Sequence, residues 1–297
     1  MRVFLTGATG FIGTAIVPEL INAGHEVLGM ARSDEGAKKL VALGAEVHRG
    51  DIEDLDSIRS GATGSDAVIH LAFNHDFSKF AANCETDRRV IETLSSVLEG
   101  SGRPLIVTSG TAIANTVPGE LATEDAPALS SAAMPRAASE ETAVAAVAKG
   151  VRASIVRLPQ VHDTKKQGLV TYAIAMAREK GVSAYIGEGG NRWPAAPVLD
   201  VAQLYRLVLE KGTAGARYNA VVEEGVSMRE IAEVIGRGLK VPVISITPEE
   251  AAGHFGWLAM FAGRDIPASS ALTRERLGWN PTGRGLISDL EEMDYSA

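Results

Sequence analysis

Three glycines stand at fixed spacing immediately after the first apolar run of the chain. Residues 2–6 are that run, and Gly7, Gly10 and Gly13 follow it in Thr-Gly-Ala-Thr-Gly-Phe-Ile-Gly. Residues 11–23 then carry apolar side chains at helical spacing. A strand, a glycine turn and a helix in this order constrain the fold strongly, because they open a parallel α/β sheet that binds a dinucleotide.

Each glycine of this loop has its own predicted task. Gly7 permits the tight turn, Gly10 lets the backbone approach a pyrophosphate, and Gly13 lets the helix pack closely on the sheet. The free amides at the helix start would face the phosphates. The loop therefore predicts cofactor contacts from Gly7, Thr9, Gly10, Phe11, Ile12 and Gly13.

The next part of the chain repeats the alternation of strand and helix. Continuous apolar runs, typical of strands buried on both faces, occur at 26–31, 45–49, 67–72, 105–108 and 154–158. Helices are predicted between them at 35–43, 84–98 and 137–149. We expect an α/β fold: a Rossmann-type doubly wound parallel sheet with a smaller C-terminal α+β substrate domain.

Beyond Pro159 the alternation becomes irregular, so a second region is expected there. We expect a nucleotide-binding domain of residues 1–160 plus roughly 192–220, and a smaller substrate-binding region of 161–191 plus 221–297. The segment 254–261 gathers several of the few aromatic residues. It could line a substrate pocket, form a dimer face or fill the second core, and core filling is the favoured interpretation.

Composition excludes several classes of function. Lys and Arg total 29 against 37 Asp and Glu, and the basic residues are scattered, which disfavours a nucleic-acid partner. The single Cys84 leaves no disulfide framework or cysteine metal cluster, and no metal-ligand spacing is seen. No apolar run approaches membrane-spanning length, and the N-terminus does not read as a signal peptide. We expect a cytoplasmic protein with a small-molecule substrate, and a homodimer is an open alternative.

The residues after the second predicted strand bear on cofactor choice. An acidic residue there would hold the ribose 2′-hydroxyl of NAD, whereas an Arg accommodates the 2′-phosphate of NADP. Arg32 and Ser33 favour NADP(H) over NAD(H), with Asp34 as the alternative ribose ligand. Asp51 and Ile52, after the third strand, are expected at the adenine edge, although Asp51 could instead cap the following helix.

Further short motifs follow the predicted strands and helices. They are Gly50-Asp51-Ile52, His70-Leu71-Ala72, Thr108-Ser109, Arg157-Leu158-Pro159, Leu199-Asp200-Val201-Ala202 and Leu277-Gly278-Trp279-Asn280-Pro281. With these motifs the chain resembles, over nearly its whole length, the extended short-chain dehydrogenase/reductases of the NAD-dependent epimerase/dehydratase type. The resemblance implies further cofactor contacts from Leu71, Ala72, Thr108 and Pro159.

The catalytic pair of that family is missing. The resemblance implies a Ser or Thr at the end of the fifth strand, which Ser109 matches with Thr111 as a neighbour, and a Tyr and Lys four residues apart. Arg136 and Glu140 stand at the Tyr and Lys positions. Arg136 could stabilise charge without relaying protons, because a guanidinium stays protonated. The favoured interpretation is a simple ion pair between Arg136 and Glu140, one helical turn apart.

Another group must then supply the proton. His162, just past the sixth strand, is the candidate acid, although a structural, hydrogen-bonded His is the commoner case. Tyr172, Tyr185, Arg192 and Trp193 are the candidate substrate contacts, and the last two could instead brace the return of the chain into the sheet.

Three functions fit these observations. The leading hypothesis is an NADP(H)-dependent reductase of a small carbonyl, imine or activated alkene, with Ser109 orienting the substrate. The second is a catalytically silent NADP(H)-binding sensor or scaffold, which the missing pair favours. A nucleotide-sugar epimerase or lyase is the weakest, because no acid/base pair is present.

Overall fold

The computed structural model describes residues 1–296 except 115, 116 and 118. Its central feature is a seven-stranded sheet in which every pairing is parallel. The strands lie in the order β10 (Arg217–Asn219), β6 (Arg152–Leu158), β5 (Pro104–Gly110), β4 (Ala67–His70), β1 (Arg2–Thr6), β2 (Glu26–Ala31) and β3 (Glu46–Arg49). The winding reverses between β1 and β4, and ligands of such sheets bind at that point, beyond the carboxyl ends of the strands. The predicted doubly wound fold is confirmed.

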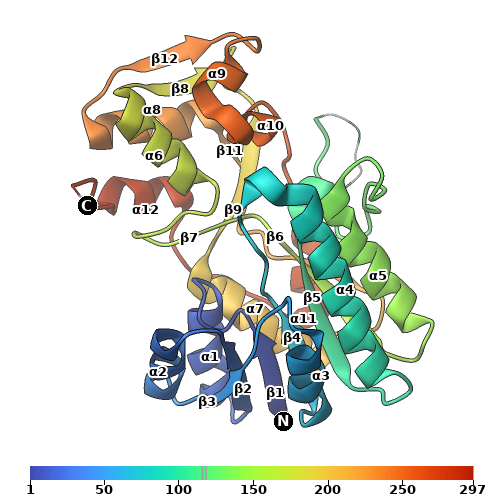
Figure 1. The fold of residues 1–297 in the computed structure, drawn as a ribbon. Coiled ribbons are helices and arrows are strands. Elements are labelled where there is room, and N and C mark those ends of the chain that lie inside the picture. Colours follow the sequence, from blue (N-terminus) through green and yellow to red (C-terminus); the bar gives the residue numbers. More distant parts are fainter. Residues whose placement is uncertain (115–116, 118, 297) are drawn as a thin grey trace.

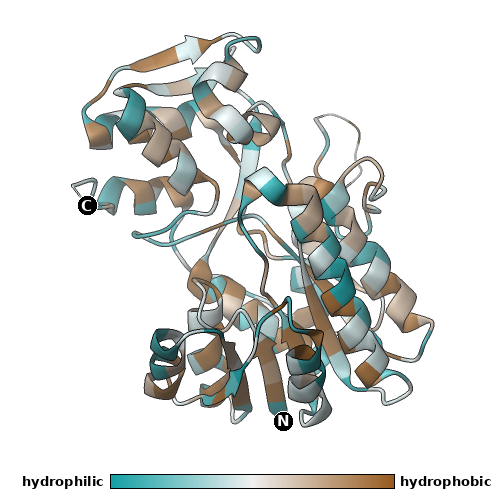
Figure 2. Ribbon diagram, viewed as in Figure 1, coloured by the Kyte–Doolittle hydropathy of each residue, from teal (hydrophilic) through white to brown (hydrophobic). Residues whose placement is uncertain are grey.

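Helices cover both faces of this sheet (Figure 1). One face carries α1 (Gly13–Asn22), α2 (Asp34–Ala42) and α7 (Val198–Lys211), and the other carries α3 (Leu55–Thr63), α4 (Phe80–Leu98) and α5 (Ala138–Val147). Figure 2 shows the hydrophobic residues concentrated on the strands and on the helix faces turned toward them. This is the burial that the continuous apolar runs predicted.

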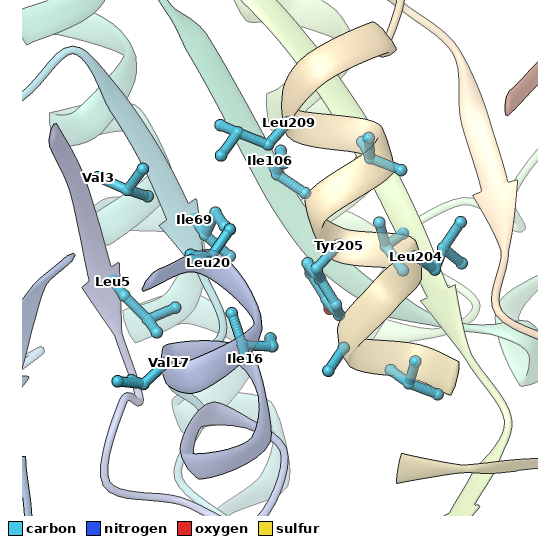
Figure 3. Packing of buried hydrophobic residues seen from close by; sticks show 14 of the residues in the cluster. Val3, Leu5, Ile16, Val17, Leu20, Ile69, Ile106, Leu204, Tyr205 and Leu209 are labelled. Atoms are coloured by element: carbon cyan, nitrogen blue, oxygen red, sulfur yellow. The ribbon is translucent and has the colours of Figure 1, made fainter. Parts of the chain in front are cut away.

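The first core layer joins α1 and α7 to the sheet. Ile16 and Leu20 of α1 point toward α7 and Tyr205 of α7 points toward α1, while Val17 lies on the β1 side of α1, as Figure 3 shows; Leu204, on the far side of α7, belongs to the same cluster. All five are fully buried. This packing fixes the start of α1, and hence the glycine loop, relative to the sheet.

Local hydrogen bonds explain where the next two helices begin. The Ser33 hydroxyl accepts the Gly36 N–H at the start of α2, and the Asp54 carboxylate accepts two N–H groups at the start of α3. The alternative that Asp51 caps this helix is therefore wrong. Asp51 instead accepts the backbone N–H of Glu53 at 3.0 Å.

The smaller region has its own core. It contains α6 (Val170–Lys180), α8 (Met228–Leu239), α9 (Ala251–Phe255), α10 (Ala259–Ala262), α12 (Leu286–Glu292) and the paired strands β8 (Ser183–Ile186) and β12 (Val243–Ile246). A three-stranded sheet of β7 (Gln160–His162), β9 (Arg192–Pro197) and β11 (Glu223–Ser227) lies between the two regions. No helix of the described residues is long and apolar enough to cross a membrane.

The predicted domain boundaries stay a prediction. One segment of the predicted smaller region packs on the larger one. Helix α11 (Ala271–Leu277) contacts β10 and α7, and Leu277 and Trp279 are buried in the core of the large sheet. The chain thus returns to the nucleotide-binding side near its C-terminal end.

Candidate active site

The glycine loop has the close contacts expected of a phosphate-binding turn. Gly7 has a φ of +70°, and a Cβ there would lie 2.8 Å from the Ala72 backbone nitrogen. A Cβ on Gly13 would lie 2.2 Å from the Gly7 carbonyl oxygen. A Cβ on Gly10 would meet only that same oxygen, at 3.2 Å, so the space beyond Gly10 is open. The loop therefore fits a dinucleotide pyrophosphate.

The other predicted cofactor residues lie along the same edge of the sheet. Because the strands are parallel, residues that follow their carboxyl ends are neighbours. They are Gly7 after β1, Arg32 and Ser33 after β2, Asp51 and Ile52 after β3, Leu71 and Ala72 after β4, Thr108 near the end of β5 and Pro159 after β6. Their contacts with a cofactor stay predictions.

Positive charge gathers where a ribose 2′-substituent would lie. The Arg32 side chain is 75% exposed, with Asp51 3.6 Å away. Asp34, the alternative ribose ligand, forms an ion pair with Arg49. Lys39 lies nearby and donates to the Thr9 carbonyl at 3.4 Å. Because the Arg32 guanidinium is exposed and its contact with Asp51 is long, it remains available to bind a phosphate.

Arg136 is held by two partners far from it in sequence and by the nearby Ser139. Its guanidinium donates to Asp87 Oδ2 at 2.8 Å, to the Thr108 carbonyl at 2.9 Å and to the Ser139 hydroxyl. The Phe73 ring centroid lies 4.5 Å from its Cζ. The side chain is 15% exposed, so it is fixed at the carboxyl end of β5 with limited access to solvent.

Asp87, on α4, links Arg136 to His70 at the end of β4. Its carboxylate accepts His70 Nε2 at 3.0 Å and the Ser139 hydroxyl at 2.5 Å. Burial alone would raise the pKa of Asp87, but the Arg136 charge and the His70 and Ser139 hydrogen bonds lower it to about 2. This carboxylate is therefore ionised and fully partnered.

The tautomer of His70 follows from its second partner. Thr6 Oγ1 accepts the backbone N–H groups of Leu71 and Ala72, at 3.1 and 3.2 Å, which occupy both of its lone pairs. Its own proton must then point to His70 Nδ1, 2.7 Å away. His70 accordingly carries its proton on Nε2 and donates it to Asp87. We call Arg136, Asp87, Ser139, His70 and Thr6 the Arg136 network.

Glu140 belongs to a separate cluster. It accepts two hydrogen bonds from Arg157, at 2.8 and 2.9 Å, and one from Arg217 at 3.0 Å. Burial would raise the pKa of Glu140, but these two guanidiniums keep it below its ordinary value. The predicted Arg136–Glu140 ion pair is wrong, because each residue has a stronger buried partner from another element. We call Glu140, Arg157 and Arg217 the Glu140 network.

The hydroxyls at the end of β5 differ in their partners. Burial raises the pKa of Glu140, and Ser109 Oγ, itself buried, is one of the groups beside that carboxylate that lower it. Thr108 Oγ1 lies 2.7 Å from the buried Tyr205 hydroxyl, and Thr111 donates to the Leu158 carbonyl at 3.4 Å. A role for Ser109 in holding a substrate atom stays a prediction.

His162 lies in β7 and is fully buried. Its Nδ1 is 2.7 Å from Asp289 of α12, so the two residues tie the smaller region to the intermediate sheet. Its Nε2 has no partner in the part of the chain that the structure describes. The geometry agrees with the structural alternative, and a role in proton transfer stays a prediction.

The four predicted substrate residues lie in different settings. Tyr172 packs at 5.0 Å, edge to face, on Trp257, while Tyr185 lies under the Arg229 guanidinium. Arg192 forms an ion pair with Asp265 at 2.8 Å, which agrees with the alternative that it braces the return of the chain into the sheet. Trp193 is completely buried in the second core, so the prediction that it presents an aromatic face to substrate is wrong.

An aromatic cluster that the sequence did not predict bridges the two regions. Phe77, just after β4 in sequence, stacks on Trp257 with ring centroids 4.1 Å apart. Tyr172 contacts both rings, and Phe73 lies beside Phe80 at 6.4 Å. Phe255 and Phe261 of segment 254–261 fill the second core as expected, whereas Trp257 reaches across to the first region.

The sequence analysis also did not predict that Asp87 and Phe77 belong to the site. Nothing local marks them, because Asp87 is one acidic residue in a helix with several charges, and Phe77 follows a predicted loop. Only the partners that folding brings to them show their role. No group of three or more potential metal ligands occurs among the described residues.

Comparisons with known proteins place this geometry in context. A family model described as the NAD dependent epimerase/dehydratase family matches residues 3–221. An uncharacterized protein of Schizosaccharomyces pombe is 49% identical over 296 residues, covering 99% of this chain and 100% of that protein. An uncharacterized protein of Saccharomyces cerevisiae is 45% identical, with 100% and 99% covered.

Solved structures share the fold at low identity. The Thermus thermophilus UDP-glucose 4-epimerase in complex with NAD superposes with a TM-score of 0.77 at 21% identity, covering 100% of this chain and 99% of that one. At this identity the likeness shows the fold and leaves the reaction open.

Proposed function

Because the chain belongs to the NAD dependent epimerase/dehydratase family, we propose that it is an NADP(H)-dependent reductase of a small, partly apolar carbonyl, imine or activated alkene. The fold is that of the NAD(P)-dependent oxidoreductases of this family. The proposal adds the cofactor preference, the direction and the class of substrate.

The observation that carries the proposal is the fixed guanidinium of Arg136, which is bound to the Thr108 carbonyl one residue before Ser109. Three of its five N–H groups are taken by Asp87, Ser139 and Thr108, which leaves two for a ligand. A cofactor bound at the glycine loop supplies a hydride. Arg136 would stabilise the negative charge that develops on the substrate oxygen or nitrogen, and Ser109 would hold that atom. We assign the proton to water, since His162 is buried against Asp289.

The same guanidinium argues against an epimerase or lyase. Those reactions need a group that takes a proton from the substrate and returns it, and a guanidinium does not release its proton at ordinary pH. Hydride transfer to a polarised double bond needs position and charge stabilisation only. The aromatic rings of Phe73, Phe77 and Trp257 suit a partly apolar substrate.

A silent NADP(H)-binding sensor is the second candidate. The observation that favours it is that both residues at the usual catalytic positions are engaged in buried ion pairs. Such a protein would bind the cofactor, turn over nothing, and change its partner affinity with the cofactor's redox state.

Titration with NADPH and NADH, followed by fluorescence and thermal shift, tests the cofactor first. We expect NADPH to bind more tightly than NADH and Arg32→Ala to weaken NADPH by about tenfold, because a phosphate loses a charge-assisted contact. Absence of binding by either nucleotide would overturn all the candidate functions.

A panel of carbonyls, imines and activated alkenes then tests the reaction. We expect oxidation of NADPH with at least one compound and loss of that activity in Ser109→Ala. Tight NADPH binding with no turnover across the panel would favour the sensor instead.

A further inference from the structure

Lys166 reaches back to the glycine loop from the turn between β7 and α6. Its ammonium nitrogen lies 5.9 Å from the ring centroid of Phe11, which stands between Gly10 and Gly13 at the start of α1. A cation from residue 166 is thus placed beside the loop of residues 7–13, where the open space beyond Gly10 would receive phosphates.

The turn that carries Lys166 is rigid. The Asp163 carboxylate accepts the backbone N–H groups of Lys165 and Lys166 at 2.7 and 2.8 Å, and the Asp163 N–H donates to the Lys166 carbonyl. The fully buried Gln167 donates to the Asp163 carbonyl at 3.0 Å. Gly168 follows with a φ of +57°. The backbone of Lys166 is therefore held in place before any ligand arrives.

The charge of Lys166 is not neutralised by a carboxylate. Within the described residues it takes part in no ion pair, whereas most arginines near the site do. The charge of Lys166 also acts on His75, in the segment after β4. Burial lowers the pKa of His75 most, and the positive charges of Lys166 and Arg136 lower it further. Lys166 is exposed, so its ammonium is free to take an anion beside the phosphate-binding loop.

We propose that Lys166 binds the pyrophosphate of the dinucleotide, an inference that rests on the proposed cofactor site. The glycine loop holds the phosphates from one side by backbone N–H groups, and Lys166 donates to them from the other. The ammonium contributes charge without fixed geometry, as a compact cation does toward phosphate. Because Lys166 comes from the turn that leads into the smaller region, it joins that region to the cofactor.

The test uses the full chain, two probes and matched variants. Lys166→Gln removes the charge, Lys166→Arg keeps it, and Lys165→Gln removes the charge of the exposed neighbour on the same turn. The probes are NADPH, which has the pyrophosphate, and adenosine 2′-phosphate, which lacks it. Dissociation constants are measured by fluorescence and by competition at low salt, where charge effects are largest.

We expect Lys166→Gln to weaken NADPH by about tenfold and adenosine 2′-phosphate by less than about twofold. Lys166→Arg and Lys165→Gln should stay within about threefold of the unmodified protein for both probes. Arg32→Ala should weaken both probes, because both carry the 2′-phosphate.

Other results separate this inference from the proposed function. Unchanged NADPH affinity in Lys166→Gln, with normal binding by the unmodified protein, overturns the role of Lys166 and leaves the cofactor assignment standing. Equal losses for Lys165→Gln and Lys166→Gln, or for both probes, also overturn it, since they indicate a general charge effect. If the unmodified protein binds no NADPH, the proposed function and this inference fail together.

Discussion

The Arg136 network and the Glu140 network begin one helical turn apart, yet they differ in access. Arg136 is 15% exposed and lies between the cofactor edge of the sheet and Phe73. Glu140 and Arg157 are 1% and 0% exposed, and they hydrogen-bond to each other, to Arg217 and to the Thr123 carbonyl. A pair without exposed surface cannot be reached by a ligand, whereas a partly exposed guanidinium with free N–H groups can.

The difference teaches how access separates two buried charge clusters. Arg136 is a cation that a buried aspartate from α4 compensates. Glu140 is an anion that arginines from β6 and β10 compensate. That these two residues replace the Tyr and Lys of the family stays a prediction from the sequence.

Reversing the charge of Glu140 should have the largest effect on the free energy of unfolding. Glu140→Lys would place a third cation against Arg157 and Arg217 in a site without solvent. Loss of a buried partner costs about 3–5 kcal/mol, and the added repulsion brings the total beyond about 5 kcal/mol. We expect little soluble folded protein, measured by urea unfolding and by yield.

A reversed pair provides the control. Glu140→Lys combined with Arg157→Glu restores opposite charges and should recover much of the lost stability, because the coupling between the two sites is strong. A Glu140→Lys variant that unfolds at the same urea concentration as the unmodified protein would contradict the structural role of this network.

Breaking the Arg136 network at Asp87 should have a smaller and pH-dependent effect. At neutral pH Asp87→Asn leaves Arg136 without its buried counter-charge, at a cost of about 3 kcal/mol. The pKa of Asp87 is about 2 when folded against an ordinary 3.8, so the carboxylate stabilises the fold above pH 4. That contribution, about 2 kcal/mol, is lost as the pH falls from about 4 to 2.

Urea unfolding at pH 6 and pH 2.5 measures this difference. The gap between Asp87→Asn and the unmodified protein should narrow at the lower pH. Asp265→Asn is the matched control, because Asp265 and its partner Arg192 are about one-third exposed and their pair is worth about 1 kcal/mol or less. A constant gap at both pH values would mean that folding does not lower the pKa of Asp87.

The two networks also mark what the sequence could predict. The glycine loop, the parallel sheet and the strand ends were predictable, because Gly7, Gly10 and Gly13 act through local backbone geometry and the apolar runs through burial. The ion pairs were not predictable in the same way. A helical spacing of four suggested an Arg136–Glu140 pair, but Asp87 is 49 residues from Arg136 and Arg157 is 17 from Glu140.

The smallest change in stability, and the one that separates the two networks by function, is expected from Arg136→Lys. The charge beside Asp87 remains, while the hydrogen bond to the Thr108 carbonyl and the flat contact with Phe73 are lost, which costs about 1–2 kcal/mol. An ammonium carries its three N–H groups on one atom, so when Asp87 and Ser139 hold it, it cannot reproduce the planar pair of N–H groups that Arg136 has left for a substrate. We therefore expect kcat/KM for the substrate found in the panel to fall about 100-fold, or about 2.7 kcal/mol, with NADPH affinity within about threefold.

Arg217→Lys makes the same chemical change in the Glu140 network and should leave turnover unchanged. If Arg217→Lys lowered turnover and Arg136→Lys did not, the reacting group would lie in the Glu140 network and the assignment of roles would be reversed.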